Sequence, residues 1–223
     1  TFRVAAGEIL GFAGLQGSGN SELFHGLFGA CGDEVGDSVM LDGRPFRSVS
    51  PAYSLRHGVA LLTNDRKGNG LVPALSTARN ITLAALKKFS PRGWLRPKSE
   101  QEAAATQRDA LNIRVASLDQ EVGELSGGNQ QKVVLAKWLE TAPKVLLLDE
   151  PTRGVDIGAK HEIYELMNRL TATGISILLI TSEMPELLAL ADRILVMHRG
   201  RIVAEFDRTA ATPEKIAHAA MGE

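Results

Sequence analysis

The last third of the sequence alternates short apolar runs with helical patterns, and this alternation limits the possible folds more than any other feature. The runs "KVLLLD" (144–149), "ISILLIT" (175–181) and "RILVMH" (193–198) have the length of strands. Helical patterns near 157–172 and 184–191 separate them. Further strands are predicted at 39–43, 59–63 and 201–206, and further helices at 50–58 and 212–221. Such alternation favours a parallel α/β core. We also expect an antiparallel β portion formed by the early strands.

Composition narrows the class of protein. The chain has 223 residues, of which 44% are hydrophobic and 23% charged, as in an ordinary globular domain. The net charge of −1 gives no indication of nucleic-acid binding. One cysteine, Cys31, excludes an internal disulfide, and the longest apolar runs are far shorter than the roughly 20 residues of a membrane helix. The chain begins at Thr1 within a strand-like run, so we expect a fragment whose upstream part is missing.

A glycine-rich loop lies between the first predicted strand and the first predicted helix. The strand "EILGFAG" (8–14) leads into "GLQGSGNS" (14–21), and "SELFHGLF" (21–28) continues as a helix. The loop nearly matches the phosphate-binding pattern G-x-x-x-x-G-K-[ST], but Asn20 stands where the lysine belongs. The strand–loop–helix order supports a phosphate-binding loop, and its missing cation leaves open whether it is functional.

Two acidic residues end the apolar run 144–149. Asp149 lies at a predicted carboxyl end, where parallel sheets bind ligands, and could hold Mg²⁺ directly or through water. Glu150 could polarise an attacking water. The alternative is a pair of acidic residues that ends a strand before a proline turn. The residues alone leave both interpretations open.

The segment "LSGGNQQKVVLAKWL" (125–139) predicts a helix with an open amino terminus. Ser126 can cap this helix, and Gly127 and Gly128 leave its first N–H groups bare for an anion such as phosphate. An ordinary capped helix with a polar start is the alternative. The doubled glycine argues against it, because glycine costs roughly 1 kcal/mol relative to alanine in a helical turn.

The middle of the chain contains helical patterns at 77–86 and 99–113. They are joined by "KKFSPRGWLRPK" (87–98), whose two prolines and five positive charges predict a surface loop. We therefore expect a helical subdomain over 76–125 and a core formed by 1–75 and 126–223.

Together these motifs resemble the nucleotide-binding domain of an ABC transporter over the whole chain. "LSGGNQQK" resembles the specific ABC signature, and "LLLDEPT" resembles a Walker B strand with its catalytic glutamate. "RGVDIGAK" (153–160) resembles the D-loop, "TSEMPE" (181–186) the switch region, and "GLQGSGNS" a degenerate Walker A loop. The resemblance implies a P-loop NTPase fold with an ABC-ATPase core and a helical subdomain, binding ATP and Mg²⁺.

The resemblance also assigns roles to individual residues. It implies catalytic roles for Glu150 and Ser182, metal contacts at Ser21 and Asp149, and a place near the dimer interface for Asp156. The implied nucleotide-binding residues are Gly14, Gln16, Gly17, Ser18, Gly19, Asn20, Ser21 and Asn64. The implied signature residues, which act in trans on the nucleotide of a partner domain, are Ser126, Gly127, Gly128 and Gln130.

A narrower resemblance comes from "LSGGNQQK", "NDRKGNGLV" (64–72), "PTRGVDIGAK" and the serine in the switch region. These resemble the second domain of tandem ATPases that drive ribose-, galactoside- and xylose-type sugar importers. The implied partners are an N-terminal ABC domain of the same polypeptide, transmembrane permease subunits and, indirectly, a sugar-binding protein. The implied location is the cytoplasmic face of the membrane, with about 64–80 at the permease, where "GLVPAL" (70–75) would leave apolar surface partly exposed.

Three positions depart from a working ATPase of this family. Asn20 replaces the Walker A lysine, Ser182 replaces the switch histidine, and Asn64 stands where relatives have glutamine or glutamate. The basic pair Arg66 and Lys67 follows, and we favour a solvated loop there over a contact with nucleotide or membrane partner.

Three hypotheses follow from these observations. The chain is an ATP-hydrolysing module of a sugar importer whose hydrolysis occurs mostly at the partner's site. Alternatively, it is a non-catalytic structural half that binds no nucleotide itself. An ABC protein that acts on nucleic acid is disfavoured by the near-neutral charge.

Overall fold

A six-stranded sheet forms the first of two units into which the chain divides in the computed structural model, which describes residues 1–31 and 39–222. This unit, the sheet unit, comprises Thr1–Leu61, Pro143–Glu150 and Asn168–Glu223. The second, the helical unit, comprises Leu62–Ala142 and Pro151–Met167. The range 76–125, expected to be a helical subdomain, lies inside the helical unit.

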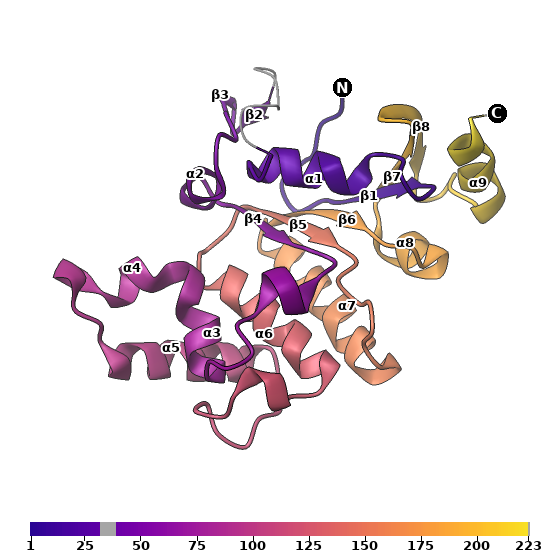
Figure 1. Cartoon of the computed structure of the whole chain (residues 1–223). Coiled ribbons are helices and arrows are strands. Elements are labelled where there is room, and N and C mark those ends of the chain that lie inside the picture. Colours follow the sequence, from indigo (N-terminus) through magenta and orange to yellow (C-terminus); the bar gives the residue numbers. More distant parts are fainter. Residues whose placement is uncertain (32–38, 223) are drawn as a thin grey trace. The chain divides into compact units, whose positions relative to one another are not determined.

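The main sheet has the strand order β4-β5-β6-β1-β7-β8 (Figure 1). Its strands are β1 (Ile9–Gly14), β4 (Val59–Leu62), β5 (Val145–Asp149), β6 (Ser176–Ile180), β7 (Arg193–His198) and β8 (Arg201–Asp207). β1 pairs in parallel with β6 and β7, and β5 pairs in parallel with β6. These central strands are almost entirely buried, which explains why they read as continuous apolar runs. The predicted α/β class with a mostly parallel sheet is confirmed.

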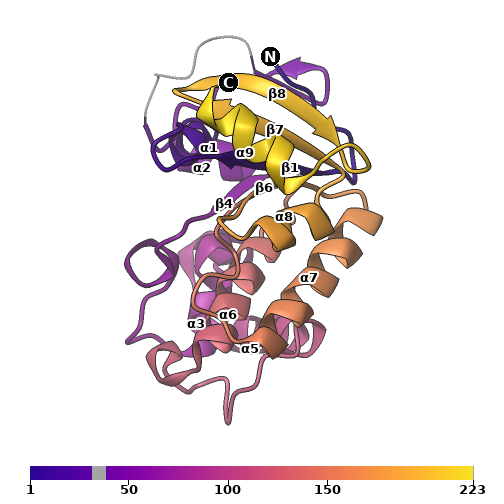
Figure 2. The same cartoon turned by 90° about the vertical axis from the view of Figure 1, so that its right-hand side faces the viewer.

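The antiparallel strands lie partly elsewhere than predicted. The early strands β2 (Met40–Leu41) and β3 (Arg44–Pro45) do pair antiparallel, but as a separate two-stranded sheet. The antiparallel strand of the main sheet is β8, which pairs with β7 at the edge (Figure 2). Its two-residue turn, Arg199 and Gly200, has positive φ at both residues, as tight hairpins require.

Four helices of the sheet unit are α1 (Asn20–Phe28), α2 (Pro51–Arg56), α8 (Met184–Leu190) and α9 (Pro213–Met221). The caps that the sequence predicts are present, because Ser50 accepts from the Tyr53 N–H and Thr212 from the Lys215 N–H. α8 and α9 pack in one cluster with β1 and β7, and α9 lies beside β7 in Figure 2.

The helical unit contains α3 (Thr77–Thr82), α4 (Leu86–Phe89), α5 (Pro97–Ala110), α6 (Gly127–Leu139) and the start of α7 (Ile157–Ala172). Short turns intervene: η1 (Arg66–Gly70), η2 (Leu83–Ala85), η3 (Pro91–Gly93) and η4 (Val122–Glu124). Ser126 caps α6 as predicted. The expectation of a loop throughout 87–98 is wrong in part, because α4 continues to Phe89 and α5 already begins at Pro97, a residue suited to the first helical turn. None of the helices in the described residues is long and apolar enough to cross a membrane.

Buried polar groups hold the segment between η1 and α3. The Asn80 side chain is fully buried, accepts from the Val72 N–H at 2.9 Å, and donates to the carbonyls of Val72, Leu75 and Ser76. Lys137, also buried, donates to the Gly70 carbonyl at 2.5 Å, and burial lowers the pKa of its ammonium to about 8. These contacts order the segment without help from a partner.

The segment 70–75 leaves apolar surface partly exposed, as expected, but Leu71 is not part of that surface. Leu71 is buried at 8% exposure, whereas Val72 is 41% exposed, and Pro73 and Ala74 are exposed as well. The fixed backbone turns Leu71 inward and Val72 outward. A charge at Leu71 would therefore disturb the core, so Val72 is the position that tests a surface contact.

We expect Asn80→Leu, which keeps the approximate volume, to lower the free energy of unfolding by about 2–4 kcal/mol, because four hydrogen bonds are lost and the partly buried Val72 N–H is left without its partner. Urea unfolding monitored by circular dichroism measures this. The control is Asn168→Leu at an exposed position of α7. Equal stabilities of the two variants would contradict the role given to Asn80.

Candidate nucleotide and signature sites

In the sheet unit, the loop between β1 and α1 is held by contacts too close for larger side chains. A Cβ at Gly14 would lie 2.6 Å from the Ser18 Oγ and 2.7 Å from the Met197 carbonyl. The Ser18 N–H donates to the Leu15 carbonyl at 2.9 Å, and the Ser18 carbonyl accepts from the Gly200 N–H at 2.7 Å. The loop therefore has a defined shape without a ligand.

The amino terminus of α1 opens onto this loop. Gly19 occupies the cap position with a φ of 100° and has no side chain to cap the helix. The first N–H groups of a helix have no intrahelical partner, and the helix dipole places positive potential at the same end. Gln16 and Gly17 are exposed beside it, and Ser21 is half-buried. The loop has the form of a phosphate cradle.

Asn20 is the first residue of α1 and is only 8% exposed. Its Oδ1 is buried and has no hydrogen-bond partner among the described residues. A buried amide oxygen without a partner costs about 1–3 kcal/mol, so this group is one that a ligand or its water shell would satisfy. The loop 14–21 contains no cationic side chain.

Strand register brings the acidic pair to the same edge of the sheet as the loop. Asp149, at the end of β5, pairs with Ile180 of β6, which pairs with Phe12 of β1, two residues before Gly14. Asp149 is 2% exposed. Glu150 follows in the left-handed region at a φ of 55°, and its N–H donates to the Ile180 carbonyl at 2.9 Å.

Ser182 contacts the acidic pair directly. Its hydroxyl donates to the Glu150 Oε2 at 3.2 Å. The two candidate catalytic residues are therefore neighbours. A hydroxyl in this place can orient the carboxylate, but it lacks the length and the titratable nitrogen of an imidazole.

A magnesium site would rest on few protein ligands. The described part of the chain has no group of three or more His, Cys, Asp or Glu residues placed to hold a metal. Mg²⁺ bound with phosphates keeps several waters and takes one or two carboxylates, so Asp149 and the Ser21 hydroxyl suit it. The glycine cradle and the uncapped helix likewise suit the phosphates of a nucleotide. The Asn20 Oδ1 is an acceptor, so it suits a donor such as a water of the Mg²⁺ shell and not a phosphate oxygen.

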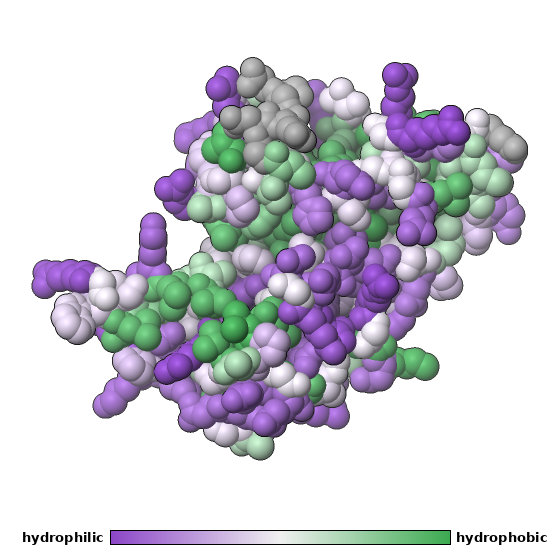
Figure 3. Space-filling view, in the orientation of Figure 1, coloured by the Kyte–Doolittle hydropathy of each residue, from purple (hydrophilic) through white to green (hydrophobic). Residues whose placement is uncertain are grey.

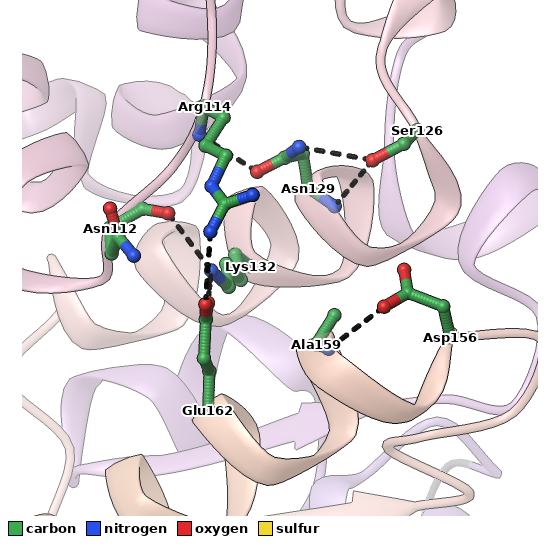
Figure 4. A network of polar contacts seen from close by, with 8 residues as sticks. All are labelled: Asn112, Arg114, Ser126, Asn129, Lys132, Asp156, Ala159 and Glu162. Carbon is green, nitrogen blue, oxygen red and sulfur yellow. Dashed lines mark hydrogen bonds and ion pairs between the residues drawn. The ribbon is translucent and has the colours of Figure 1, made fainter.

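In the helical unit, the signature segment places an exposed serine at the start of α6 (Figure 4). The Ser126 Oγ accepts from the Asn129 N–H at 3.4 Å and from the Asn129 Nδ2 at 3.0 Å. The Asn129 Oδ1 in turn accepts from the Arg114 N–H at 2.8 Å. Two donors thus occupy the two lone pairs of the hydroxyl, which leaves its proton to be donated outward.

Asn129 was missed by the sequence reasoning, which named Gln130 instead. The Gln130 side chain is buried and donates to carbonyls of the preceding turn, including that of Leu125 at 3.1 Å. The Gln130 side chain thus holds the turn that precedes α6 from its buried side. The spacing of Asn129 three residues after the cap is the signal that could have identified it.

The two signature glycines are required by close packing against the segment 153–159. A Cβ at Gly128 would lie 2.6 Å from the Ala159 Cβ, and one at Gly127 would lie 2.8 Å from the Gly154 carbonyl. The Asp156 Oδ1 caps the start of α7 by accepting from the Ala159 N–H at 2.9 Å. The buried Lys132 of α6 pairs with Glu162 of α7 one turn further on (Figure 4).

Arg66 joins this cluster, so the expectation of a solvated loop is wrong for this residue. Its Nη1 donates to the Arg153 carbonyl at 2.9 Å and its Nη2 to the Gly154 carbonyl at 3.4 Å. Nη2 also lies 2.8 Å from where a Gly127 Cβ would be. Burial lowers the pKa of its guanidinium. The backbone carbonyls it binds carry no side-chain signal, which is why the sequence did not indicate the contact. Lys67 beside it is exposed.

Asn64 is an exposed residue just after β4 and belongs to the helical unit, whereas the other candidate nucleotide-binding residues belong to the sheet unit.

A glycine loop between strand and helix, with acidic residues following β5 at the same edge of the sheet, is the arrangement of the P-loop class of nucleotide-binding folds. The chain belongs to the ABC transporter family, whose family model matches residues 1–153. ATP binding and hydrolysis are general in this family.

Two curated relatives are each 46% identical over 222 residues and come from Geobacillus kaustophilus (strain HTA426). They are the ribose import ATP-binding protein RbsA and the xylose import ATP-binding protein XylG. Each alignment covers 100% of this chain but only 45% and 44% of the relatives, so the chain spans about half their length.

Solved structures agree on the fold. A nucleotide-free ATP-binding cassette from an ABC transporter matches with a TM-score of 0.79 at 23% identity, covering 100% of this chain and 91% of that one. The dimeric structure of a post-hydrolysis state of the cassette MJ0796, bound to ADP and Pi, has a TM-score of 0.78 at 20% identity, covering 93% and 88%. At these identities the likeness establishes the fold alone.

We expect Gly128→Ala to lower the free energy of unfolding by about 1–3 kcal/mol, because the added methyl overlaps the Ala159 side chain and must push α7 away from α6. Gly158→Ala is the matched control: its Cβ would meet only the Asp156 Oδ1 at 3.5 Å, an ordinary contact. Alanine there should leave stability unchanged or raise it by up to about 1 kcal/mol through helix propensity. Chemical denaturation compares the two, and an unaffected Gly128→Ala protein would refute the packing argument.

Proposed function

We propose that this chain is the second nucleotide-binding domain of a tandem ATPase for sugar import, in which it donates an intact signature but carries a weakened nucleotide site of its own. The names of the curated relatives and their roughly doubled length support the tandem arrangement. The proposal places an N-terminal ABC domain in the same polypeptide as the immediate partner.

The observation that carries the proposal is the hydrogen bonding of Ser126. With both lone pairs occupied by Asn129, the hydroxyl is available only as a donor, and it stands at the amino terminus of α6 beside bare N–H groups. Such an end binds a group that offers acceptors and negative charge, as phosphate does. We assign this end to a nucleotide held by a second domain. A cassette of the same fold is dimeric with ADP and Pi bound, so pairing of two such domains is available to this fold.

The nucleotide site formed by this chain's own loop 14–21 lacks a positive charge to hold the phosphates. A lysine ammonium about 4 Å from a phosphate charge contributes roughly 4 kcal/mol at an effective dielectric constant near 20. The neutral Asn20 amide can contribute only a hydrogen bond, worth about 1 kcal/mol net. Gly14, Ser18, Gly19 and Ser21 would still hold the phosphates weakly, with Asp149 toward Mg²⁺. When bound, ATP supplies the phosphoryl group that is transferred to water. Glu150 would orient that water, and the Ser182 hydroxyl would in turn orient the Glu150 carboxylate.

The further partners follow from the proposed transport role. Permease subunits would contact the helical unit near Val72. The side chain of Val72 faces solvent because Asn80 holds its backbone by hydrogen bonds. A sugar-binding protein would act indirectly through the permease. This assembly would hold the domain at the cytoplasmic face of the membrane.

The second candidate is a structural half that binds no nucleotide in the cell. The neutral, buried Asn20 is the observation that favours it. Titration with MgATP distinguishes the two candidates: micromolar affinity supports the first, and absence of binding at millimolar concentration supports the second.

We expect this chain alone to hydrolyse ATP slowly or not at all, and Asn20→Lys to tighten MgATP binding without restoring full turnover. The lysine restores a charge at the phosphates, but Ser182 still lacks the reach of an imidazole, and losses within one site are strongly non-additive. Steady-state ATPase assays and calorimetric titration measure the two effects. The double variant Asn20→Lys/Ser182→His is the informative comparison. Its ATP turnover should be higher than that of either single variant. Robust turnover by the unmodified chain would refute the weakened site.

Ser126→Arg should abolish hydrolysis by the full-length polypeptide that includes the upstream domain, because the long side chain blocks the helix end donated to the partner's nucleotide. Ser117→Arg, at an exposed serine of the helical unit outside α6, controls for the added charge and should retain activity. The measurement is ATPase turnover of the two purified full-length variants. An active Ser126→Arg protein would show that this helix end does not serve the partner's site.

A further inference from the structure

The connection between α4 and α5 presents large apolar side chains to solvent. Trp94 is 82% exposed, Leu95 46% and Leu86 38%. We call residues 86–98 the tryptophan loop. Large apolar side chains exposed on one short segment indicate a surface that another phase or molecule covers.

The tryptophan loop is ordered by its own hydrogen bonds. The Arg96 N–H donates to the Phe89 carbonyl at 2.9 Å and closes the base, while the Gly93 N–H donates to the Ser90 carbonyl at 3.0 Å. Phe89 is buried at 3% exposure and anchors the loop in the helical unit. The exposure of Trp94 is therefore built into the fold.

The charge of the tryptophan loop has one sign. It contains Lys87, Lys88, Arg92, Arg96 and Lys98 and no acidic residue. Lys88 pairs with Glu140. The other four cations are exposed, and none forms an ion pair with an acidic residue in the described ranges 1–31 and 39–222.

Apolar and cationic side chains thus share one short surface segment. Figure 3 shows apolar side chains gathered over α3 and α4, with hydrophilic side chains extending beyond them at the edge of the helical unit. Tryptophan favours the boundary between water and lipid, because its ring is apolar and its N–H is polar. Arginine and lysine can lay their apolar stems along a hydrophobic surface while the charged ends stay in water.

We propose that the tryptophan loop docks on the anionic headgroup surface of the membrane, with Trp94 and Leu95 at the headgroup level and four cations beside them. A permease surface is the competing occupant. The cytoplasmic loops of membrane proteins are themselves rich in lysine and arginine, so they would repel this loop, whereas anionic headgroups attract it. The proposal rests on the proposed permease attachment, which would bring the helical unit within reach of lipid.

The test is binding of the purified chain to lipid vesicles, measured by flotation. We expect partitioning onto phosphatidylglycerol-rich vesicles that falls with added salt, and little onto pure phosphatidylcholine vesicles. Each cation near an anionic surface contributes roughly fivefold, so replacing Lys87, Arg92, Arg96 and Lys98 with glutamine should lower partitioning at least tenfold. Trp94→Ser should lower it severalfold and abolish any vesicle-induced blue shift of tryptophan emission.

Matched controls separate a specific surface from general charge. The quadruple glutamine variant of Arg44, Arg56, Arg169 and Arg201 removes as many exposed cations from the sheet unit. Val203→Ser removes an apolar side chain that is 47% exposed on β8. Both should bind anionic vesicles like the unmodified chain, and all variants should keep its melting temperature.

Equal binding to neutral and anionic vesicles, or undiminished binding by the loop variants, would overturn the proposal. So would loop variants that bind vesicles normally but fail to co-purify with the permease, because that outcome assigns the loop to a protein partner. The vesicles contain neither permease nor nucleotide, so failure here leaves the proposed ATPase role standing, and loss of ATPase function leaves this result unaffected.

Discussion

Backbone approach too close for a Cβ atom is the constraint on which both candidate sites depend. In the sheet unit, Gly14 lets the chain turn against Ser18 and the Met197 carbonyl, and the turn opens the amino terminus of α1. In the helical unit, Gly127 and Gly128 let the start of α6 approach the segment that leads into α7. The amino terminus of α1 has Gly19 at its cap position and no side-chain cap, whereas Ser126 caps α6 and the next two residues, Gly127 and Gly128, carry no side chain. The exposed donors follow from packing and are in place before any ligand binds.

The sequence was most informative where local chemistry and burial agree. The strands β5 and β6 could be predicted because they are apolar on both faces. The start of α6 could be predicted because serine is favoured at the cap position of a helix. Asp149 could be placed at the carboxyl end of its strand once the sheet was predicted to be parallel. These predictions rest on rules that act within one element or between neighbouring strands.

Prediction failed where side chains bind distant backbone. Arg66 contacts the carbonyls of Arg153 and Gly154, which are 87 and 88 residues away and leave no trace in side-chain pattern. The charges and prolines of 87–98 suggested a loop, yet Pro97 begins α5, since proline is accepted in a first helical turn. Leu71 and Val72 are both apolar, and the backbone contacts of the buried Asn80 and Lys137 fix the segment in which Leu71 faces inward and Val72 faces solvent.

The hydrogen bonding of Ser126 also determines which chemical groups the amino terminus of α6 would not bind. A serine in water accepts and donates with equal ease, so it tolerates cations, amines and carbonyls alike. Here Asn129 fills both lone pairs, and the Arg114 N–H fixes the Asn129 amide in the orientation that does so. A hydrated cation or an ammonium group would meet only protons at this point. The uncharged Asn129 amide thus makes the Ser126 hydroxyl selective for groups that offer an acceptor oxygen.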